Sequence, residues 1–400
     1  MATPATKIRF RESQIEMAHG AGGKASRRLV EGLFAPLLYG SSQSPLGDAA
    51  HIQINGTRIA MTTDSFVVKP LRFPGGSIGE LAINGTVNDL AVSGARAEAI
   101  VVTYILEAGL PTEILEAEVR AMGQAAEKAG VVIAGGDTKV VDHGQADQMY
   151  ITTTGIGRLL SGVEISPQSV RPSDKVLLSG AIGDHGITIL LARGDLDLEA
   201  ELRSDTRSVL PLVQGLVSVA GPGVRWMRDP TRGGVATSLN ELARDCGHGI
   251  VLFEEKIPVR DSVRGACELL GLDPLHIANE GQFLAIVSSE HAESALQALR
   301  ATPGGEEAII IGEVREQPAS AVLVTLPSQP ERAKERRRAL SSGWRQPLPR
   351  RHQSFPASLC RGMDRENRLR RRHDQVRGVR RKRARSPRAC DKESRLIPGG

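Results

Sequence analysis

The segment 131–141 holds residue types that bind and process charged ligands. An apolar run and a pair of glycines ending at Gly136 are followed by Asp137, Thr138 and Lys139. Glycines let a backbone approach a bulky anion because they lack Cβ. A carboxylate suits a hard divalent cation, and an amine neutralises phosphate or, when desolvated, acts as a base. We predict a buried strand that ends in a glycine turn. Taken alone, the segment is equally typical of a turn with a surface salt bridge.

Acidic residues also follow apolar runs at earlier positions. Asp48 follows a Leu-Gly pair, Asp64 ends the apolar run 58–63, and Asn88 and Asp89 lie in a helical pattern. A single acid at a strand end is usually a cap or a solvated carboxylate. Three of them, together with the acid at position 137, indicate an oxygen-liganded Mg²⁺ site that also carries a nucleotide triphosphate.

The segment 15–24 is a glycine-rich loop that leads into a helix predicted to start near Ser26. It resembles a Walker A loop only loosely, because Ala18 and Ala25 stand where that motif needs Gly and Ser or Thr. The loop is predicted to close on phosphates, and a plain helix-capping loop remains an open alternative. The residues predicted to contact the nucleotide are Gly22, Gly23 and Lys24.

The pattern between these motifs is that of an α/β protein. A helix is predicted over 111–129, where apolar residues are spaced by four and three, and strands are predicted over 99–106 and 150–156. A polar stretch with two prolines at 166–174 indicates a boundary, after which a strand is predicted over 175–180. The predicted divisions are 1–40, a glycine-loop segment; 41–165, an ATP-binding and dimerisation domain; 166–326, a second α/β domain; and 327–400, a tail.

The second domain repeats the association of acids with glycines. Asp229 precedes a Pro-Thr-Arg-Gly-Gly turn, and Glu280 stands before the predicted strand 283–287. Glu280 is interpreted either as an ordinary turn carboxylate or as an acid aimed at the site. Cys246 and Cys267 fall on the apolar faces of predicted helices, which indicates core positions.

Composition narrows the class of protein. Aromatic residues are only 3% of the 400-residue chain, so cores must consist of aliphatic residues. The four cysteines form no CxxC pair, which argues against structural zinc, and their scatter suits a reducing cytoplasm. No signal-length apolar core and no 18-residue apolar window is found, so we expect a cytoplasmic protein without a membrane segment.

The charge is unevenly distributed. Residues 327–400 hold 20 Arg and 3 Lys against 7 acids, a net charge of +16, whereas the whole chain carries +5, so residues 1–326 carry −11. We predict a disordered basic tail without hydrophobic periodicity. Such a run binds nucleic acid through phosphates, but it lacks interleaved aromatic residues. A nucleic-acid-binding protein therefore stays an alternative, with non-specific binding by the tail as the expected form.

These motifs together resemble the HypE family of hydrogenase maturation proteins. The order of strand-end acids is shared with aminoimidazole ribonucleotide synthetase, selenophosphate synthetase and thiamine-monophosphate kinase, and the blocks 64–70 and 136–141 single out HypE. The glycine loop has no Cys or selenocysteine, which argues against a selenophosphate synthetase. The segments that carry the resemblance are 46–48, 62–70, 73–76, 85–91, 136–141, 183–186, 229–234 and 279–281.

The resemblance implies a two-domain fold with mixed sheets flanked by helices, like that of aminoimidazole ribonucleotide synthetase, assembled as a homodimer. It implies ATP-dependent dehydration of a carbamoylated C-terminal cysteine to a thiocyanate, which supplies cyanide to a [NiFe] hydrogenase. HypF and the HypC–HypD complex are the implied partners. Lys139 and Glu280 are implied in proton transfer. The implied Mg²⁺ and ATP ligands are Asp48, Asp64, Asp89 and Asp229, joined by Asn88, Gly136, Asp137 and Thr138.

The carrier cysteine departs from the family pattern, in which a Pro-Arg-Ile-Cys arm ends the chain. Here Cys390 follows Pro-Arg-Ala and is itself followed by ten residues, while Cys360 matches nothing. The tail is interpreted either as the product of an alternate reading frame or as a natural extension in which Cys390 acts. We expect the ten trailing residues to hinder the chemistry at Cys390 although ATP still binds.

Overall fold

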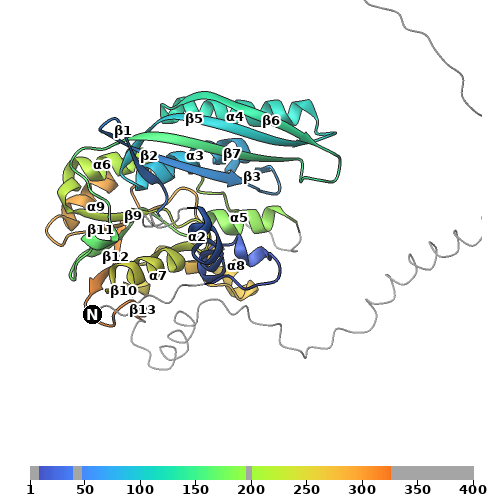
Figure 1. Ribbon diagram of the computed structural model, residues 1–400. Helices are drawn as coiled ribbons and strands as arrows, with labels where there is room; N and C mark the ends of the chain where they lie inside the picture. The colour runs from blue at the N-terminus through green and yellow to red at the C-terminus, as the bar shows by residue number, and fades with distance from the viewer. Residues whose placement is uncertain (1–8, 39–46, 195–200, 326–400) are drawn as a thin grey trace, which may run out of the picture. The chain divides into compact units, whose positions relative to one another are not determined.

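The computed structural model describes residues 9–38, 47–194 and 201–325 (Figure 1). The predicted tail, with Cys360 and Cys390, lies outside the described residues. Among the helices that the structure describes, none is long and apolar enough to cross a membrane.

The first sheet has five strands in the order β1-β2-β7-β5-β6. Only β5 and β6 pair in parallel, and the other neighbours are antiparallel. The strands are β1 (Ala50–Ile54), β2 (Thr57–Phe66), β5 (Ala95–Glu107), β6 (Val132–Val141) and β7 (Met149–Leu159). Two helices, α3 (Ile78–Val92) and α4 (Thr112–Ala129), lie along this sheet (Figure 1), and a two-stranded hairpin of β3 (Arg72–Phe73) and β4 (Gly76–Ser77) precedes α3.

The second sheet has six strands in the order β13-β10-β12-β8-β11-β9. Its strands are β8 (Lys175–Leu178), β9 (Val224–Arg228), β10 (Gly249–Phe253), β11 (Leu284–Val287), β12 (Ile309–Arg315) and β13 (Val322–Thr325). Its helices are α5 (Asp184–Ala192), α6 (Leu210–Ala220), α7 (Gly234–Cys246), α8 (Asp261–Leu270) and α9 (Ala292–Ala301). The predicted mixed α/β architecture is confirmed by both sheets.

Helix α3 is the element that holds the two sheets together. It is buried on nearly all sides, and one continuous hydrophobic cluster runs from Leu81 and Leu90 on this helix to Leu212 on α6 and Phe283 beside β11. Burying such aliphatic side chains contributes about 1.5–3 kcal/mol each. The helix therefore fixes the position of Asp89 relative to the strands of the second sheet.

Helix α4 confirms the prediction made from spacing. Residue Pro111 stands at its N-cap, and Gly130 ends it in the left-handed region with φ 66°. Glycine adopts this conformation without strain because it has no Cβ. The predicted helical pattern around positions 88 and 89 is likewise confirmed, as part of α3.

The prediction for segment 131–141 was wrong in two respects. The glycines do not open a turn, because β6 continues through them with a register shift opposite Ile100 and Val101. A Cβ on Gly136 would lie 1.8 Å from the carbonyl oxygen of Val102, so the glycine permits close pairing of two strands. The strand is also not buried: Val132 and Val140 are 63% and 66% exposed. This edge strand is an apolar surface of the chain.

The N-terminal segment contains a 3₁₀ turn (Met17–His19), α1 (Gly23–Leu29), a π-helical stretch (Val30–Phe34) and α2 (Ala35–Leu38). The helix predicted to start near Ser26 starts three residues earlier. Helix α1 contacts α7 through an ion pair between Arg27 Nη2 and Asp245 Oδ1 at 3.0 Å. The glycine loop is thereby held over the second sheet's helices.

Candidate functional site

Three acidic side chains from distant parts of the sequence converge. The carboxylates of Asp48, Asp89 and Asp229 each offer an oxygen atom, and these atoms lie within 4.8 Å of one another. Asp48 precedes β1, Asp89 is on α3, and Asp229 follows β9 directly. We refer to these three residues as the acidic triad.

Residue Thr62 on β2 links two members of the acidic triad. Its Oγ1 lies 2.9 Å from Oδ2 of Asp89, to which it donates, and 2.7 Å from the carbonyl oxygen of Asp48. Thr62 is itself buried, with 7% exposure. The hydroxyl therefore holds the turn before β1 and the α3 carboxylate in a fixed relation.

Burial and mutual repulsion raise the pKa values of the acidic triad. Burial, and next the charge of Asp48, raises the pKa of Asp229 to about 8. Burial, followed by the charges of Asp229 and Asp48, raises the pKa of Asp89 well above its ordinary value. The pKa of Asp48 is raised by burial and lowered by the neighbouring arginines Arg228 and Arg232. Close carboxylates of this kind need a cation or a proton to offset their charge.

The donor set of the acidic triad fits a magnesium ion. Mg²⁺ prefers oxygen ligands and is usually held by one or two carboxylates together with substrate phosphates. All three side chains offer carboxylate oxygens, and within the described residues no His or Cys joins this group. The chemistry of the residues thus suits a hard divalent cation rather than zinc.

Two further predicted acids lie in the same electrostatic neighbourhood. Asp64 on β2 accepts a hydrogen bond from the backbone of Ser65 at 2.7 Å, and its charge raises the pKa values of all three members of the triad. Burial and then the charge of Asp229 raise the pKa of Glu280 well above its ordinary value. Neither the Asp64 nor the Glu280 carboxylate is among the oxygen groups that lie within 4.8 Å of one another. Because their charges interact with those of the triad, we describe them as bordering it.

Residue Asn88 lies beside the triad but its amide is used elsewhere. Its Nδ2 donates to the carbonyl oxygens of Arg207 at 2.9 Å and Glu280 at 3.3 Å, and its Oδ1 accepts from the backbone of Val209 at 2.8 Å. The side chain is 1% exposed. It fixes the two segments that approach the site from the second sheet.

Glu280 is held by a residue that the sequence did not single out. Both carboxylate oxygens of Asp205 accept backbone hydrogen bonds, from Glu280 at 3.1 Å and from Gly281 at 3.2 Å. The guanidinium of Arg207 donates to the carbonyl oxygen of Gly281 at 2.9 Å. Nothing in the spacing of residues 201–209 indicates this contact, because it depends on the tertiary fold.

The glycine loop contacts the turn that carries Asp229. A Cβ on Gly22 would lie 2.9 Å from the carbonyl oxygen of Arg232, so this loop and this turn are in direct contact. The backbone N–H of Gly22 donates to Ser26 Oγ at 2.8 Å, which links the loop to α1. Gly23 and Lys24 form the first turn of α1, where Lys24 is exposed.

The structure does not bring the 136–139 group to the acidic triad within one chain. Lys139 Nζ pairs with Asp137 Oδ2 at 2.8 Å, and both side chains are exposed on β6, as is Thr138 beside them. Among the described charged groups, Lys139 is not one that shifts the pKa of any triad member. The predicted carrier Cys390 lies outside the described residues.

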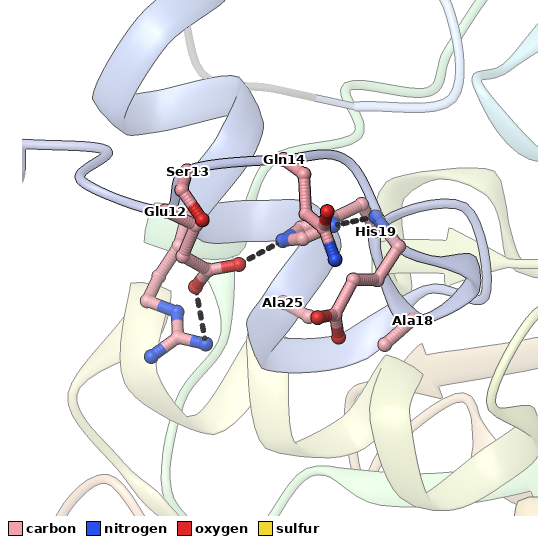
Figure 2. Close-up of a pocket in the computed structure, with 8 residues that line it drawn as sticks. Glu12, Ser13, Gln14, Ala18, His19 and Ala25 are labelled. Atoms are coloured by element: carbon pink, nitrogen blue, oxygen red, sulfur yellow. Dashed lines mark hydrogen bonds and ion pairs between the residues drawn. The ribbon is translucent and has the colours of Figure 1, made fainter.

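A small polar pocket forms separately in the N-terminal segment (Figure 2). The carboxylate of Glu12 pairs with Arg28 Nη2 at 3.0 Å through one oxygen and contacts His19 through the other, and Figure 2 shows Glu12 facing His19. His19 Nδ1 accepts a hydrogen bond from the backbone of Glu16 at 2.8 Å, so its Nε2 carries the proton that is donated to Glu12. Both ring nitrogens of His19 are thus occupied by contacts within this segment.

The fold and the acidic site define a class of protein. The family model described as AIR synthase related protein, N-terminal domain, matches residues 46–159, and the C-terminal domain model matches residues 171–325. The chain is thus a two-domain protein of the AIR synthase related class.

Closer relatives narrow the class to one family. The chain is 48% identical over 309 residues to carbamoyl dehydratase HypE of Azotobacter vinelandii, covering 77% of this chain and 90% of the relative. A solved HypE–HypF complex matches with a TM-score of 0.70 and 43% identity, covering 74% of this chain and 95% of that one. HypE in complex with ATP matches with a TM-score of 0.65 at 43% identity, covering 79% and 99%. The chain belongs to the HypE family.

Proposed function

We propose that this chain has the site of an ATP-dependent carbamoyl dehydratase, an enzyme that converts a cysteine thiocarboxamide into a thiocyanate for [NiFe] hydrogenase maturation, and that the ten residues after Cys390 block turnover in the full chain. The observation that carries the proposal is the convergence of Asp48, Asp89 and Asp229 in a chain 48% identical to a carbamoyl dehydratase. A related HypE has been solved in complex with ATP, and we extend ATP binding to this chain.

The reaction needs ATP because the amide oxygen is a poor leaving group. In the first step this oxygen attacks the γ-phosphorus of ATP, the bond to ADP breaks, and the nitrogen gives up one proton. In the second step the carbon–oxygen bond breaks, inorganic phosphate leaves, and the second nitrogen proton is removed as the carbon–nitrogen triple bond forms. The net change is ATP and thiocarboxamide to ADP, phosphate and thiocyanate.

We assign metal binding and proton transfer to different residues. The acidic triad would hold Mg²⁺, with Asp64 beside it, and the ion would neutralise phosphate charge. We assign proton transfer within one chain to Glu280, because it borders the triad, where burial and then the charge of Asp229 raise its pKa well above the ordinary value, so that it holds a proton more readily than an exposed glutamate. The glycine loop with Gly22, Gly23 and Lys24 would close on the phosphates, since it touches the Asp229 turn.

A role for Lys139 in proton transfer requires a second copy of the chain, because Lys139 does not reach the triad of its own chain. Strand β6 exposes Val132, Ile133 and Val140 at the edge of the first sheet, and an exposed apolar edge strand is usually covered. A homodimer paired through this surface would cover the strand that carries Asp137 and Lys139. Light scattering at micromolar concentration tests it, and a monomer would contradict it.

The proposed partners follow from a related protein. A HypE–HypF complex has been solved for a relative, and we propose a HypF-type carbamoyltransferase as donor to this chain. The HypC–HypD complex as acceptor of cyanide, the cytoplasmic location and the domain limits at 41–165 and 166–326 remain parts of the proposal.

Calorimetry tests the nucleotide site. We expect the full chain to bind ATP with Mg²⁺, and Asp229→Asn to weaken the Mg²⁺-dependent binding by at least tenfold, because one triad ligand loses its charge. Ser208→Ala, at a half-buried position outside the triad, is the control. If the full chain binds no ATP with Mg²⁺, the proposal is wrong.

A further inference from the structure

One arginine lies against the acidic triad and is itself anchored. Arg228 ends β9, immediately before Asp229. Its Nε lies 3.0 Å from Asp48 Oδ1, and its Nη1 lies 3.1 Å from Glu241 Oε2 on α7. The side chains of these three residues are 25%, 13% and 20% exposed, so water screens them only in part.

The bridge by Arg228 distinguishes Asp48 from the rest of the triad. Asp89 has the Thr62 hydroxyl as its partner, whereas Asp48 is the triad member that forms an ion pair within the described residues. The charge of Arg228 is also the largest influence that lowers the pKa of Asp48. One oxygen of this carboxylate therefore faces a fixed positive charge.

A divalent cation on the triad would meet this charge directly. Two positive charges a few ångströms apart in a partly buried site repel each other more strongly than they would in water. The guanidinium also pairs with Oδ1 of Asp48, one of the two oxygen atoms that this carboxylate can offer a metal ion. Glu241 holds the other end of the guanidinium, so Arg228 shares its charge between two carboxylates.

We propose that Arg228 is a built-in counterion of the acidic triad, which suppresses divalent-cation binding until nucleotide is present, with Glu241 setting how strongly it engages Asp48. This inference rests on the proposed metal-nucleotide site. The triphosphate brings negative charge that offsets Arg228, so metal binding is favoured together with nucleotide. Arg228 acts through Asp48 and is a positioning residue.

Mn²⁺ binding to the full chain, followed by the electron paramagnetic resonance signal of free Mn²⁺, tests the inference without any turnover. Without nucleotide, Arg228→Met is expected to bind Mn²⁺ about tenfold more tightly than the wild type, because a repelling charge is removed. Arg228→Lys keeps the charge and is expected to stay close to the wild type. With ATP present, the difference between Arg228→Met and the wild type should shrink.

Arg225→Met is the matched control, since Arg225 lies on the same strand and pairs with Asp174 at 4.0 Å instead of with the triad. Its Mn²⁺ affinity is expected to equal that of the wild type. Glu241→Gln tests the same inference if Arg228→Met fails to fold: the released Arg228 should engage Asp48 more strongly and weaken Mn²⁺ binding severalfold.

The outcomes separate the inference from the proposed function. If the wild type binds no Mn²⁺ even with ATP, the proposed metal site is wrong. If the wild type binds Mn²⁺ with ATP, but folded Arg228→Met binds nucleotide-free Mn²⁺ no more tightly, the counterion role is wrong. Unchanged or tighter binding by Glu241→Gln likewise overturns it.

Discussion

The side-chain amide of Asn88 donates to the backbone carbonyl of Arg207 at 2.9 Å, across the junction of the two sheets. The same amide accepts from the buried backbone N–H of Val209 at 2.8 Å. Helix α3 thus uses one residue to hold the connecting segment, while the next residue, Asp89, belongs to the acidic triad. Asn88 therefore stabilises the junction of the two sheets, and the adjacent Asp89 contributes to the site.

We therefore predict that Asn88→Ala destabilises the protein by about 3 kcal/mol, because the buried N–H of Val209 loses its partner. Urea unfolding at neutral pH measures the change. Asn240→Ala is the control: Asn240 on α7 makes one local hydrogen bond, to Ala236, at a half-buried position. A shift no larger than that of the control would contradict the role of Asn88.

The turn that carries Glu280 depends on a glycine. A Cβ on Gly281 would lie 1.8 Å from the carbonyl oxygen of Asp205, so Gly281→Ala forces the segments apart. We expect a loss of about 2 kcal/mol or more, as for other overpacked buried sites. Gly123→Ala on α4 has open space at its Cβ and should be neutral or stabilising by up to about 1 kcal/mol. Equal thermal shifts for the two variants would show that the contact is not restrictive.

Local patterns in the sequence predicted the elements but not all of their contacts. The 4-and-3 spacing over 111–129 and the glycine at 130 were sufficient for α4. The glycine pair before Asp137 was misleading, because glycine serves close strand pairing as well as turns, and only the position of Val102 distinguishes the two. The same local pattern therefore had two structural solutions.

The acids of the site were visible because each stands next to a glycine, a proline or an apolar run. Their supports were not, since Asp205 and Thr62 reach the site from other segments and the ion pair of Arg228 with Asp48 depends on the tertiary fold. Arg228 is adjacent to Asp229 in sequence, but adjacency alone does not indicate that its guanidinium pairs with Asp48. Convergence of side chains from several strands has no local signature.

A buried histidine provides a pH-dependent prediction. His185 at the start of α5 is 7% exposed, and burial lowers its pKa from 6.5 to about 4. Its Nδ1 contacts Ser204 Oγ at 2.8 Å, and its ring packs edge-on against Phe73. Below pH 6.5 His185 binds a proton in the unfolded chain but not in the folded chain. The free energy of unfolding therefore decreases as the pH falls from about 6.5 to about 4.

We expect His185→Gln to reduce the difference in unfolding free energy between pH 7.5 and pH 4.5 by about 2–3 kcal/mol. Denaturant unfolding at the two pH values measures this difference for each variant. His51→Gln, at an exposed position on β1, should keep the pH dependence of the wild type. If His185→Gln also keeps it, another group is responsible for the acid sensitivity.

The last prediction concerns the thiol that carries the carbamoyl group. Neither cysteine of the described chain suits this role: Cys267 is 1% exposed with a pKa raised to about 11 by burial, and burial also raises the pKa of Cys246. A thiolate is the nucleophile in such chemistry, so a raised pKa disfavours both. Cys246→Ser and Cys267→Ser should leave carbamoylation unchanged.

Cys390 is then the preferred carrier, and ten residues follow it in the sequence. A thiocarboxamide at the end of an arm enters a narrow site more easily than one in the middle of a chain. We therefore predict that a chain shortened to end at Cys390 forms thiocyanate after incubation with a carbamoyl donor, ATP and Mg²⁺, while the full chain binds ATP but forms none. Mass spectrometry of the cysteine-containing peptides measures both, and Cys390→Ser in the shortened chain is the control. Cyanated Cys390 in the full chain would refute the steric argument, and cyanation at Cys360 would assign the carrier elsewhere.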